Sequence, residues 1–373
     1  MSMTNLRISP DRLRLYGGAL FLVGLTQLRF VKSVGHFWDW LDFYIAGSLA
    51  GSHALLDPPA RDAWGAAHHL PVTAFAYVPA FAWVFVPTSQ VSVAAGFVVN
   101  AVVMLAICAA SAIVAARIYG IARSLALLMI LAWAPTTAAI VTGQNSPLGL
   151  LLSLLAILGL VSDRVVLAGV AIGALCYKPT YGIPFLLLLL VFRKWKVLAV
   201  VAACGLAWYA LSATAAGGDW LWPAAYLESL KAYVGPDFAY NAPKAVSIPG
   251  LLMRLGTPAS IAFALGLLLL IAATLSMRKF SLLRAASVAG LIGVATSPHA
   301  WAYDAAVGLP ALFWVVREIP EPRRTNLVVA AYVIAPLWLA SNVLRVDLLA
   351  IVVIGLAMIC LSETRSNAGH QFA

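Results

Sequence analysis

The sequence predicts an all-α fold: a polytopic membrane bundle of helices, formed by residues 1–373 as a single integral-membrane domain. Hydrophobic residues make up 63% of the 373 residues and charged residues only 10%, whereas roughly 25% of the residues in a soluble domain are charged. Apolar runs recur at close to the ~20 residues that a helix needs to cross a bilayer. Most Lys and Arg residues fall in turns on one side of these runs. Together, these observations indicate a chain embedded in lipid.

Taken in order, the apolar runs predict about 11–12 membrane segments. The apolar runs behind this count, some of them too short to cross a bilayer alone, cover residues 13–31, 75–86, 91–116, 125–141, 148–161, 165–176, 182–192, 197–213, 260–275, 285–295, 305–316, 327–339 and 348–360. Segment 75–86 is short and is bracketed by Pro79 and Pro87. Because proline interrupts helical hydrogen bonding, we expect a half-helix or a re-entrant segment there.

A second interruption is expected at residues 177–181, between the short segments 165–176 and 182–192. Each of these segments is too short to cross a bilayer comfortably. A broken helix at membrane depth is tolerated only where its backbone lines protein or a water-filled cavity. The sequence therefore predicts that Lys178 and Pro179 lie beside such a cavity.

The positions of Lys and Arg predict the orientation of the chain. Turns that carry Arg117, Arg193 and Arg317, among other basic residues, are expected to be cytoplasmic. Both termini are then cytoplasmic, and two large polar loops, residues 34–73 and 216–249, lie outside. The first apolar run is followed by charged and aromatic residues, so no cleavable signal peptide is expected. We expect a multi-pass protein of the cytoplasmic (inner) membrane.

Composition also excludes several classes of partner. The net charge of +10 follows from the cytoplasmic bias of basic residues, so no nucleic-acid partner is expected. The four cysteines lie inside apolar runs and form no CxxC pair, which argues against a disulfide framework or a zinc site. His53, His68 and His69 have no ligand set of recognisable spacing around them. We therefore expect no metal and no cofactor.

Five polar islands lie on the predicted outer side. They are Asp39 with Asp42, Tyr77-Val78-Pro79, Gly143-Gln144-Asn145, Tyr177-Lys178-Pro179, and the stretch from Ser297 through His299 to Asp304. Placing an acidic side chain at a bilayer surface costs free energy, so an aspartate there indicates a functional site by default. Asp39 and Asp42 are three residues apart, so on a helix they share one face. We expect the five islands to face one outer cavity.

In this order, the motifs resemble the GT-C glycosyltransferases and, in finer detail, glycosyltransferase family 87, which includes polyprenyl-phosphate-mannose-dependent mannosyltransferases. The resemblance is carried by Asp42-Phe43-Tyr44 with Ala46-Gly47 and Leu56-Asp57, Tyr77-Val78-Pro79 with Pro87, Gly143-Gln144-Asn145, Ala168-Gly169 with Gly173 and Lys178-Pro179, and Ser297-Pro298 with Trp301. It implies a GT-C type bundle that moves mannose from a polyprenyl-phosphate donor to a lipid or glycan acceptor at an extracytoplasmic site. Mannosyltransferases of this group carry a His pair after the Ser-Pro and Trp element, where this chain has Tyr303-Asp304 and, earlier, His299.

Sugar transfer needs a base for the attacking hydroxyl and positive charge or hydrogen-bond donors on the departing phosphate. Asp42 fits the base, as the resemblance also implies, and Asp39 is the second candidate. Lys178, at the helix break, fits a phosphate contact. The other candidates for donor or substrate binding are Tyr77, Gln144, Asn145, Lys244, Arg254, His299, Tyr303 and Asp304. A single displacement would invert the anomeric centre.

Plainer roles and other functions remain open. An Asp at a helix end can be an N-cap, Gln144 and Asn145 can satisfy a helix terminus, and Lys178 can extend toward water. A lipid or sugar transporter or flippase would also explain the broken helices, but it predicts polar residues throughout the bilayer depth. A structural subunit would need fewer polar islands. An enzyme is therefore the leading hypothesis, with the lipid-linked donor, the acceptor and membrane lipids as partners.

Overall fold

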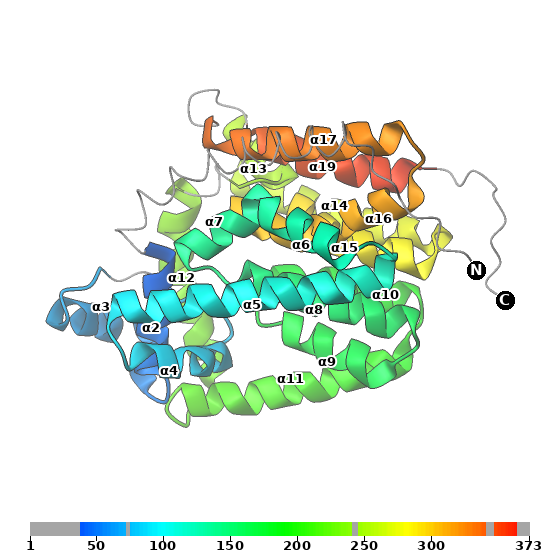
Figure 1. The fold of residues 1–373 in the computed structure, drawn as a ribbon. Helices are drawn as coiled ribbons and strands as arrows, with labels where there is room; N and C mark the ends of the chain where they lie inside the picture. Colours follow the sequence, from blue (N-terminus) through cyan, green and yellow to red (C-terminus); the bar gives the residue numbers. More distant parts are fainter. Residues whose placement is uncertain (1–37, 72–74, 241–244, 341–346, 364–373) are drawn as a thin grey trace.

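The computed structural model describes residues 38–71, 75–240, 245–340 and 347–363, and every regular element within these ranges is helical (Figure 1). This confirms the predicted all-α class. The described elements that precede the first long helix are α2 (Trp38–Leu49), η2 (His53–Leu55), α3 (Pro58–Ala67), η3 (Pro79–Phe85) and α4 (Val86–Ser89). The first predicted segment, residues 13–31, lies outside the described residues.

The remaining described helices form the body of the bundle. They are α5 (Val93–Tyr119), α6 (Arg123–Ala132), α7 (Ala134–Thr142), α8 (Ser146–Val161), α9 (Val165–Leu175), α10 (Pro179–Val191), α11 (Trp195–Ala215), α12 (Trp222–Tyr240), α13 (Ile248–Arg254), α14 (Ala259–Ser276), η5 (Met277–Lys279), α15 (Leu282–Thr296), η6 (Ala302–Gly308), α16 (Leu309–Glu318), α17 (Arg323–Ile334), η7 (Ala335–Ala340) and α19 (Leu348–Ser362).

Three of the described helical stretches are long and apolar enough to cross a membrane: Val93–Tyr119, Trp195–Ala215 and Ala259–Lys279. The bent pair α6 and α7 would make a fourth, and α8, α9, α10, α15 and α19 are shorter apolar helices. These helices support a helical membrane protein. The number of segments, about 11–12 from the sequence, stays a prediction.

Helix α15 lies at the centre of the packing. Every side chain from Arg284 through Thr296 is buried, and the helix contacts α10, α14, α16 and α19. A Cβ added at Gly293 would lie 2.5 Å from Cγ of Pro184 in α10, so the absence of a side chain there permits the close approach of the two helices. A helix that is apolar on every side is expected to lie in the interior, as α15 does.

Local chemistry explains where the structure departs from the predicted segments. Residues 125–141 were expected as one segment, but α6 and α7 are bent by 65°. Trp133 between them has an extended backbone, and Pro135 lies in the first turn of α7, where it cannot continue the hydrogen bonding of α6. Segment 75–86 forms 3-10 turns in η3, followed by the short α4, with a proline in the first turn of each.

The large polar segments, which the sequence predicted as loops with at most weak helical signals, contain several helices. Segment 34–73 holds α2 and α3, and segment 216–249 holds α12 and the start of α13. The Trp, Tyr, Pro and Gly residues of α12 are not strong helix formers, and tertiary contacts compensate. The Trp222 indole donates to the Tyr209 carbonyl (3.1 Å), and the Tyr226 hydroxyl donates to the Ala76 carbonyl (3.2 Å).

The described helices separate a polar end from a basic end. Helix α10 starts directly after Lys178 and is followed by Arg193 and Lys194. Helix α16 follows η6 and carries Arg317 in its last turn, where the guanidinium donates to the Ile118 carbonyl in the last turn of α5 (2.7 Å). In Figure 1, α2, α3 and α4 gather near the start of α5, away from its other end. Which of these two ends faces the cytoplasm stays a prediction.

Candidate active site

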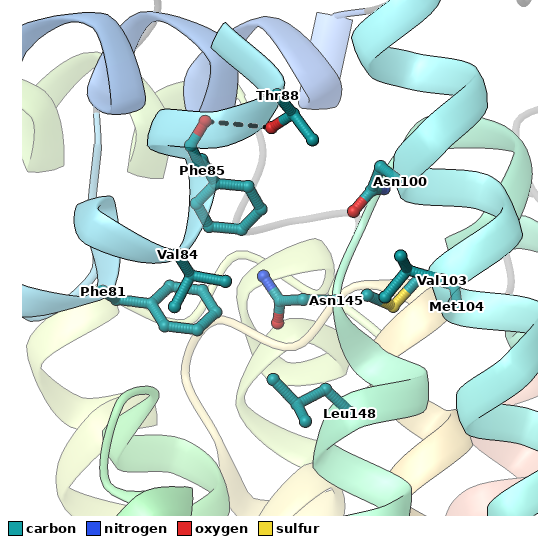
Figure 2. Close-up of a pocket in the computed structure, with 9 residues that line it drawn as sticks. All are labelled: Phe81, Val84, Phe85, Thr88, Asn100, Val103, Met104, Asn145 and Leu148. Carbon is teal, nitrogen blue, oxygen red and sulfur yellow. Dashed lines mark hydrogen bonds between the residues drawn. The ribbon is translucent and has the colours of Figure 1, made fainter.

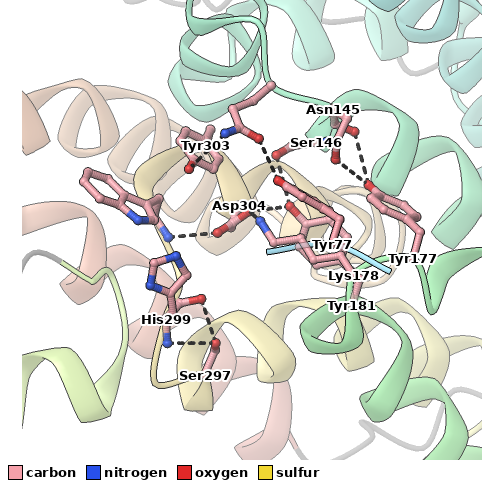
Figure 3. A network of polar contacts seen from close by, with 12 residues as sticks. Tyr77, Asn145, Ser146, Tyr177, Lys178, Tyr181, Ser297, His299, Tyr303 and Asp304 are labelled. Carbon is pink, nitrogen blue, oxygen red and sulfur yellow. Dashed lines mark hydrogen bonds and ion pairs between the residues drawn. The ribbon is translucent and has the colours of Figure 1, made fainter. Parts of the chain in front are cut away.

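Residues from several of the predicted polar islands form one network of polar and aromatic contacts at the polar end (Figure 3). The Tyr77 hydroxyl donates to Oε1 of Gln144 (3.0 Å), and Nε2 of Gln144 donates to the Tyr303 hydroxyl (3.2 Å). The Tyr177 hydroxyl donates to Oδ1 of Asn145 (2.8 Å). The structure thus brings together side chains that lie up to about 230 positions apart in the chain.

Lys178 and Asp304 form a buried ion pair within this network. Nζ of Lys178 lies 2.5 Å from Oδ1 of Asp304, and the two side chains are 12% and 2% exposed. The Tyr181 hydroxyl donates to the same carboxylate oxygen, and the Trp301 amide donates to Oδ2 (2.9 Å). Since a lysine ammonium carries three donors, the ion pair uses one of them.

Three aromatic rings surround the Lys178 ammonium. Its Nζ lies 4.9 Å from the ring centre of Tyr181, 5.5 Å from that of Tyr303 and 5.7 Å from that of Tyr77. Aromatic faces attract a cation, so the rings and the carboxylate together hold the ammonium in a largely buried setting. The arrangement can stabilise additional negative charge that develops beside the lysine.

The break between α9 and α10 presents Lys178, as the sequence predicted. Helix α9 ends at Leu175, Lys178 has an extended backbone with φ −125°, and Pro179 occupies the first turn of α10. Phe81 stacks on Tyr177 with ring centres 4.3 Å apart. Because proline cannot accept the preceding helical register, the chain turns here and directs Lys178 into the network.

A close contact with Gly143 positions helix α2. Gly143 has φ +82°, and an added Cβ would lie 2.7 Å from Cβ of Trp40. The Trp40 indole also donates to the Val93 carbonyl (3.0 Å). Only glycine accepts both the left-handed backbone and the close approach without cost. The start of α2, including Asp39, is thereby held beside the Gly143-Gln144-Asn145 turn.

Asp39 is the α2 carboxylate on the network side. Burial raises the pKa of Asp39 to about 6, partly offset by hydrogen bonding from Thr142 and Gln144 and by the charge of Lys178, whereas Asp304 adds to the rise. A carboxylate with a pKa of about 6 is ionised at pH 7 and retains more basicity than an ordinary aspartate. Asp39 therefore has the surroundings of a general base.

Asp42, one turn further along α2, has different neighbours. Its Oδ1 atom is buried and accepts no hydrogen bond from the described residues. Burial and the nearby Asp39 charge raise the pKa of Asp42 well above its usual value, and Arg61 opposes that rise. Arg61 is 5% exposed. Sequence reasoning gave Arg61 no role, and no motif in the sequence marks it.

The other sequence-based candidates differ in where they lie. His299 is on the loop after α15, where its amide donates to the Ser297 hydroxyl (3.2 Å) and its ring faces Trp301. Arg254 forms an ion pair with Asp347 (3.3 Å), the N-cap of α19. Lys244 lies outside the described residues. Sequence reasoning also missed Tyr181 and Ser146, whose hydroxyls are 3.0 Å apart, although Tyr181 lies in the same break as Lys178.

An apolar cavity of about 80 Å³ adjoins the network (Figure 2). It lies between the η3–α4 segment and helices α5 and α8, and it is lined by Phe81, Val84, Phe85, Thr88, Asn100, Val103, Met104, Asn145 and Leu148. Val84 and Val103 are 56% and 45% exposed, so the cavity adjoins the outside of the bundle. Asn145 connects the two sites: it lines the cavity, and its Oδ1 accepts the Tyr177 hydrogen bond.

The described residues contain no group of three or more His, Cys, Asp and Glu side chains that could hold a metal ion. The expectation that the chain needs neither a metal nor a cofactor stays a prediction. The network contains the Asp39 carboxylate, which is more basic than an ordinary aspartate, and the Lys178 ammonium, which three aromatic rings surround. Sugar transfer from a phosphate requires a base and a positive charge of this kind.

Comparison with known proteins gives a family match. No curated protein and no solved structure gave a significant match to this chain. The model of glycosyltransferase family 87 matches residues 75–298, which is more than half of the chain. The matched region holds Tyr77, Gln144, Asn145 and Lys178, and the α2 carboxylates and Asp304 lie outside it. The chain therefore belongs to glycosyltransferase family 87.

Proposed function

We propose that this glycosyltransferase moves a sugar, mannose by the family resemblance, from a polyprenyl-phosphate donor to a hydroxyl of a lipid or glycan acceptor. The reaction takes place on the extracytoplasmic side of the cytoplasmic membrane, and no metal takes part. The observation that carries this proposal is the Lys178–Asp304 ion pair (2.5 Å) beside Asp39, whose surroundings raise its pKa to about 6.

Asp39 is the base that we assign. The acceptor hydroxyl gives its proton to Asp39 while its oxygen bonds to the anomeric carbon, and the bond from that carbon to the phosphate oxygen breaks. The electron pair of the broken bond stays with the departing lipid phosphate. One displacement of this kind inverts the anomeric centre. The sequence-based choice, Asp42, lies one turn away, and we propose a different role for it below.

Lys178 stabilises the departing phosphate. The donor is a phosphodiester with one negative charge, and its leaving group gains a second charge as the sugar departs, so an ammonium beside it acts most strongly in the transition state. Asp304 and the three tyrosine rings position the ammonium. In this chain, the Asp304 partner stands near the place where mannosyltransferases of the group carry a His pair.

The apolar cavity suits the first part of the lipid chain of the donor. Its volume of about 80 Å³ corresponds to a few methylene groups, and apolar area buried there contributes about 0.8 kcal/mol per CH₂. The cavity adjoins exposed Val84 and Val103, where a membrane lipid can approach from the side. A chain held there would carry its phosphate toward Asn145 and Lys178.

The test is transfer by purified full-length protein in nanodiscs. Radiolabelled polyprenyl-phosphate mannose is supplied with total membrane lipids, and the products are identified by mass spectrometry. We expect a new labelled glycolipid or glycan with the wild-type protein and none with Asp39→Asn. Transfer from a nucleotide sugar but not from the lipid-linked donor would contradict the proposed donor class.

A further inference from the structure

Arg61 and Asp42 carry buried polar atoms that no described residue satisfies. Nε and Nη1 of Arg61 are buried without a hydrogen-bond partner, as is Oδ1 of Asp42. The Arg61 side chain as a whole is 5% exposed. A buried donor or acceptor left unsatisfied costs about 1–3 kcal/mol, and more for a charged group. These three atoms therefore point to a polar ligand.

The start of α3 directs Arg61 inward. Asp57 is the N-cap and accepts from the Ala60 amide (3.4 Å), and Pro58 occupies the first turn. Arg61 follows one turn later, and its buried face is shared with Gly65. An arginine in a loop outside the apolar runs would ordinarily extend into water. Here the helix start fixes it against the molecule.

Arg61 and Asp42 influence each other without forming an ion pair. The charge of Asp42 acts on Arg61, and that of Arg61 acts on Asp42, yet neither side chain satisfies the buried atoms of the other. A ligand between them would receive hydrogen bonds from the guanidinium and present a hydroxyl to the carboxyl group. Asp39 lies one turn before Asp42 on the same helix.

The surrounding charge argues against an anionic ligand. Asp57 and Asp62 also act on the single positive charge of Arg61, and burial raises the pKa of Asp42 and so disfavours its charged form. Even without a charge on Asp42, a phosphate would meet more negative than positive charge there. A neutral ring with adjacent hydroxyls fits better. Its oxygens accept from the fork of guanidinium donors, and its hydroxyl groups can either donate to Asp42 or accept from it.

We propose that Arg61 and Asp42 hold two adjacent hydroxyls of a sugar or cyclitol ring in the acceptor. This inference rests on the proposed function and assigns its acceptor class: a polyhydroxylated ring rather than a simple lipid alcohol. With the ring fixed one turn along α2, a further hydroxyl of the same ring is directed to Asp39. Arg61 and Asp42 are thus positioning residues for the acceptor.

The first experiment measures binding without transfer. Full-length wild-type protein in nanodiscs is titrated with methyl α-mannoside by ligand-observed NMR, followed by its monodeoxy analogues. We expect at least one analogue that lacks a hydroxyl of the recognised pair to bind about tenfold more weakly, because a hydrogen bond to a charged group is lost. Inorganic phosphate should not displace the glycoside. Absence of glycoside binding, or displacement by phosphate, would overturn the proposal.

Variants locate the binding site. Arg61→Gln and Asp42→Asn should each weaken glycoside binding about tenfold. The affinity of Arg61→Lys should lie between those of the wild type and Arg61→Gln, because lysine keeps the charge but lacks the planar, paired donors of the guanidinium. The matched control is Glu228→Gln, an acid that is 71% exposed and lies outside the Arg61 cluster, which should bind as the wild type does. If an Arg61 variant fails to fold, binding by Asp42→Asn and binding of the deoxy analogues to the wild type still test the proposed ring-binding site. Wild-type affinity in folded Arg61→Gln would overturn the assignment.

Transfer assays on the same preparations separate this inference from the proposed function. Suppose that glycoside binding follows the expected pattern but no sugar is transferred from the lipid-linked donor. That result would refute the proposed function and support the proposed ring-binding site. Transfer with an unchanged acceptor KM in Arg61→Gln would support the function and refute the ring site.

Discussion

Asp39 and Asp42 lie one turn apart on α2, yet their surroundings differ, and we propose different chemistry for each. Asp39 meets Gln144, Thr142 and the charge of Lys178. Asp42 instead meets Arg61 and has a buried oxygen without a partner among the described residues. Two carboxylates of one helix can thus be separated into a base and a binding group by their neighbours alone, since environment determines which carboxylate does which task.

The strongest test of this difference is to remove each carboxylate in turn. Asp39→Asn should lower kcat about a thousandfold, which is within the range for loss of a general base. Asp42→Asn should leave kcat within about threefold and raise the acceptor KM about tenfold. Steady-state kinetics with separate variation of donor and acceptor measures both. If Asp42→Asn lost kcat about a thousandfold while Asp39→Asn stayed active, Asp42 would be the base and Asp39 the binding group.

Lys178 gives the next largest expected effect. Lys178→Gln should lower kcat about a hundredfold, because the departing phosphate loses its cation. Removing one partner of a buried ion pair also destabilises the fold, so the double variant Lys178→Gln with Asp304→Asn keeps the site neutral and should be equally inactive but better folded.

Lys231 supplies the control for that substitution. It is an exposed lysine that pairs with Glu228, both side chains being 71% exposed, and Lys231→Gln should transfer at the wild-type rate. Wild-type turnover in the Lys178 double variant would remove the lysine from the mechanism.

Disturbing the contact between Gly143 and Trp40 should have a smaller effect on kcat. Gly143→Ala pushes a Cβ into Trp40 and should displace Asp39 from Gln144, with a loss of about tenfold in kcat. Gly120→Ala is the matched control: Gly120 also has a left-handed backbone, at φ +68°, but an added Cβ there meets nothing within 4 Å. Equal effects of the two variants on kcat would attribute the loss to backbone strain and not to the position of α2.

A substitution that fills the apolar cavity should have the smallest effect on transfer. Val103→Trp fills it and should raise the donor KM about fivefold, the value of one or two buried methylenes, without changing the acceptor KM. Val102→Trp alters the neighbouring residue, which is 60% exposed and does not line the cavity. If both tryptophans act alike on the donor KM, the lipid chain lies elsewhere.

Much of the site could be predicted from residue patterns. Lys178 and Pro179 marked a break between two short apolar runs, and the break is where the sequence placed it. Gln144 and Tyr303 were expected to share a cavity, and they are hydrogen bonded. The break and this hydrogen bond agree with the physical argument that polar residues inside apolar runs are costly and must be satisfied by one another. The role of these residues in a site stays a prediction.

Other features depend on tertiary packing that no local pattern encodes. The pairing of Lys178 with Asp304 joins positions 126 apart, and the burial of Arg61 depends on how α3 packs. The sequence ranked Asp42 above Asp39 because the five polar islands agreed, because an acid at the membrane surface is costly, and because the family resemblance implied the same residue. That ranking did not include the Gly143–Trp40 contact, which holds Asp39 beside Gln144. The order of the two carboxylates follows from this packing.

The pH dependence of kcat tests the role of Asp39 most directly. A base must be ionised, so activity should rise with pH and level off above the pKa of Asp39, about 6, falling about tenfold per pH unit below it. The acidic limb should keep its midpoint in Asp42→Asn, at saturating acceptor. Retention of that limb at about pH 6 in Asp42→Asn is the expected result. Its disappearance in Asp42→Asn, or its persistence in Asp39→Asn, would contradict the assignment of Asp39 as the base.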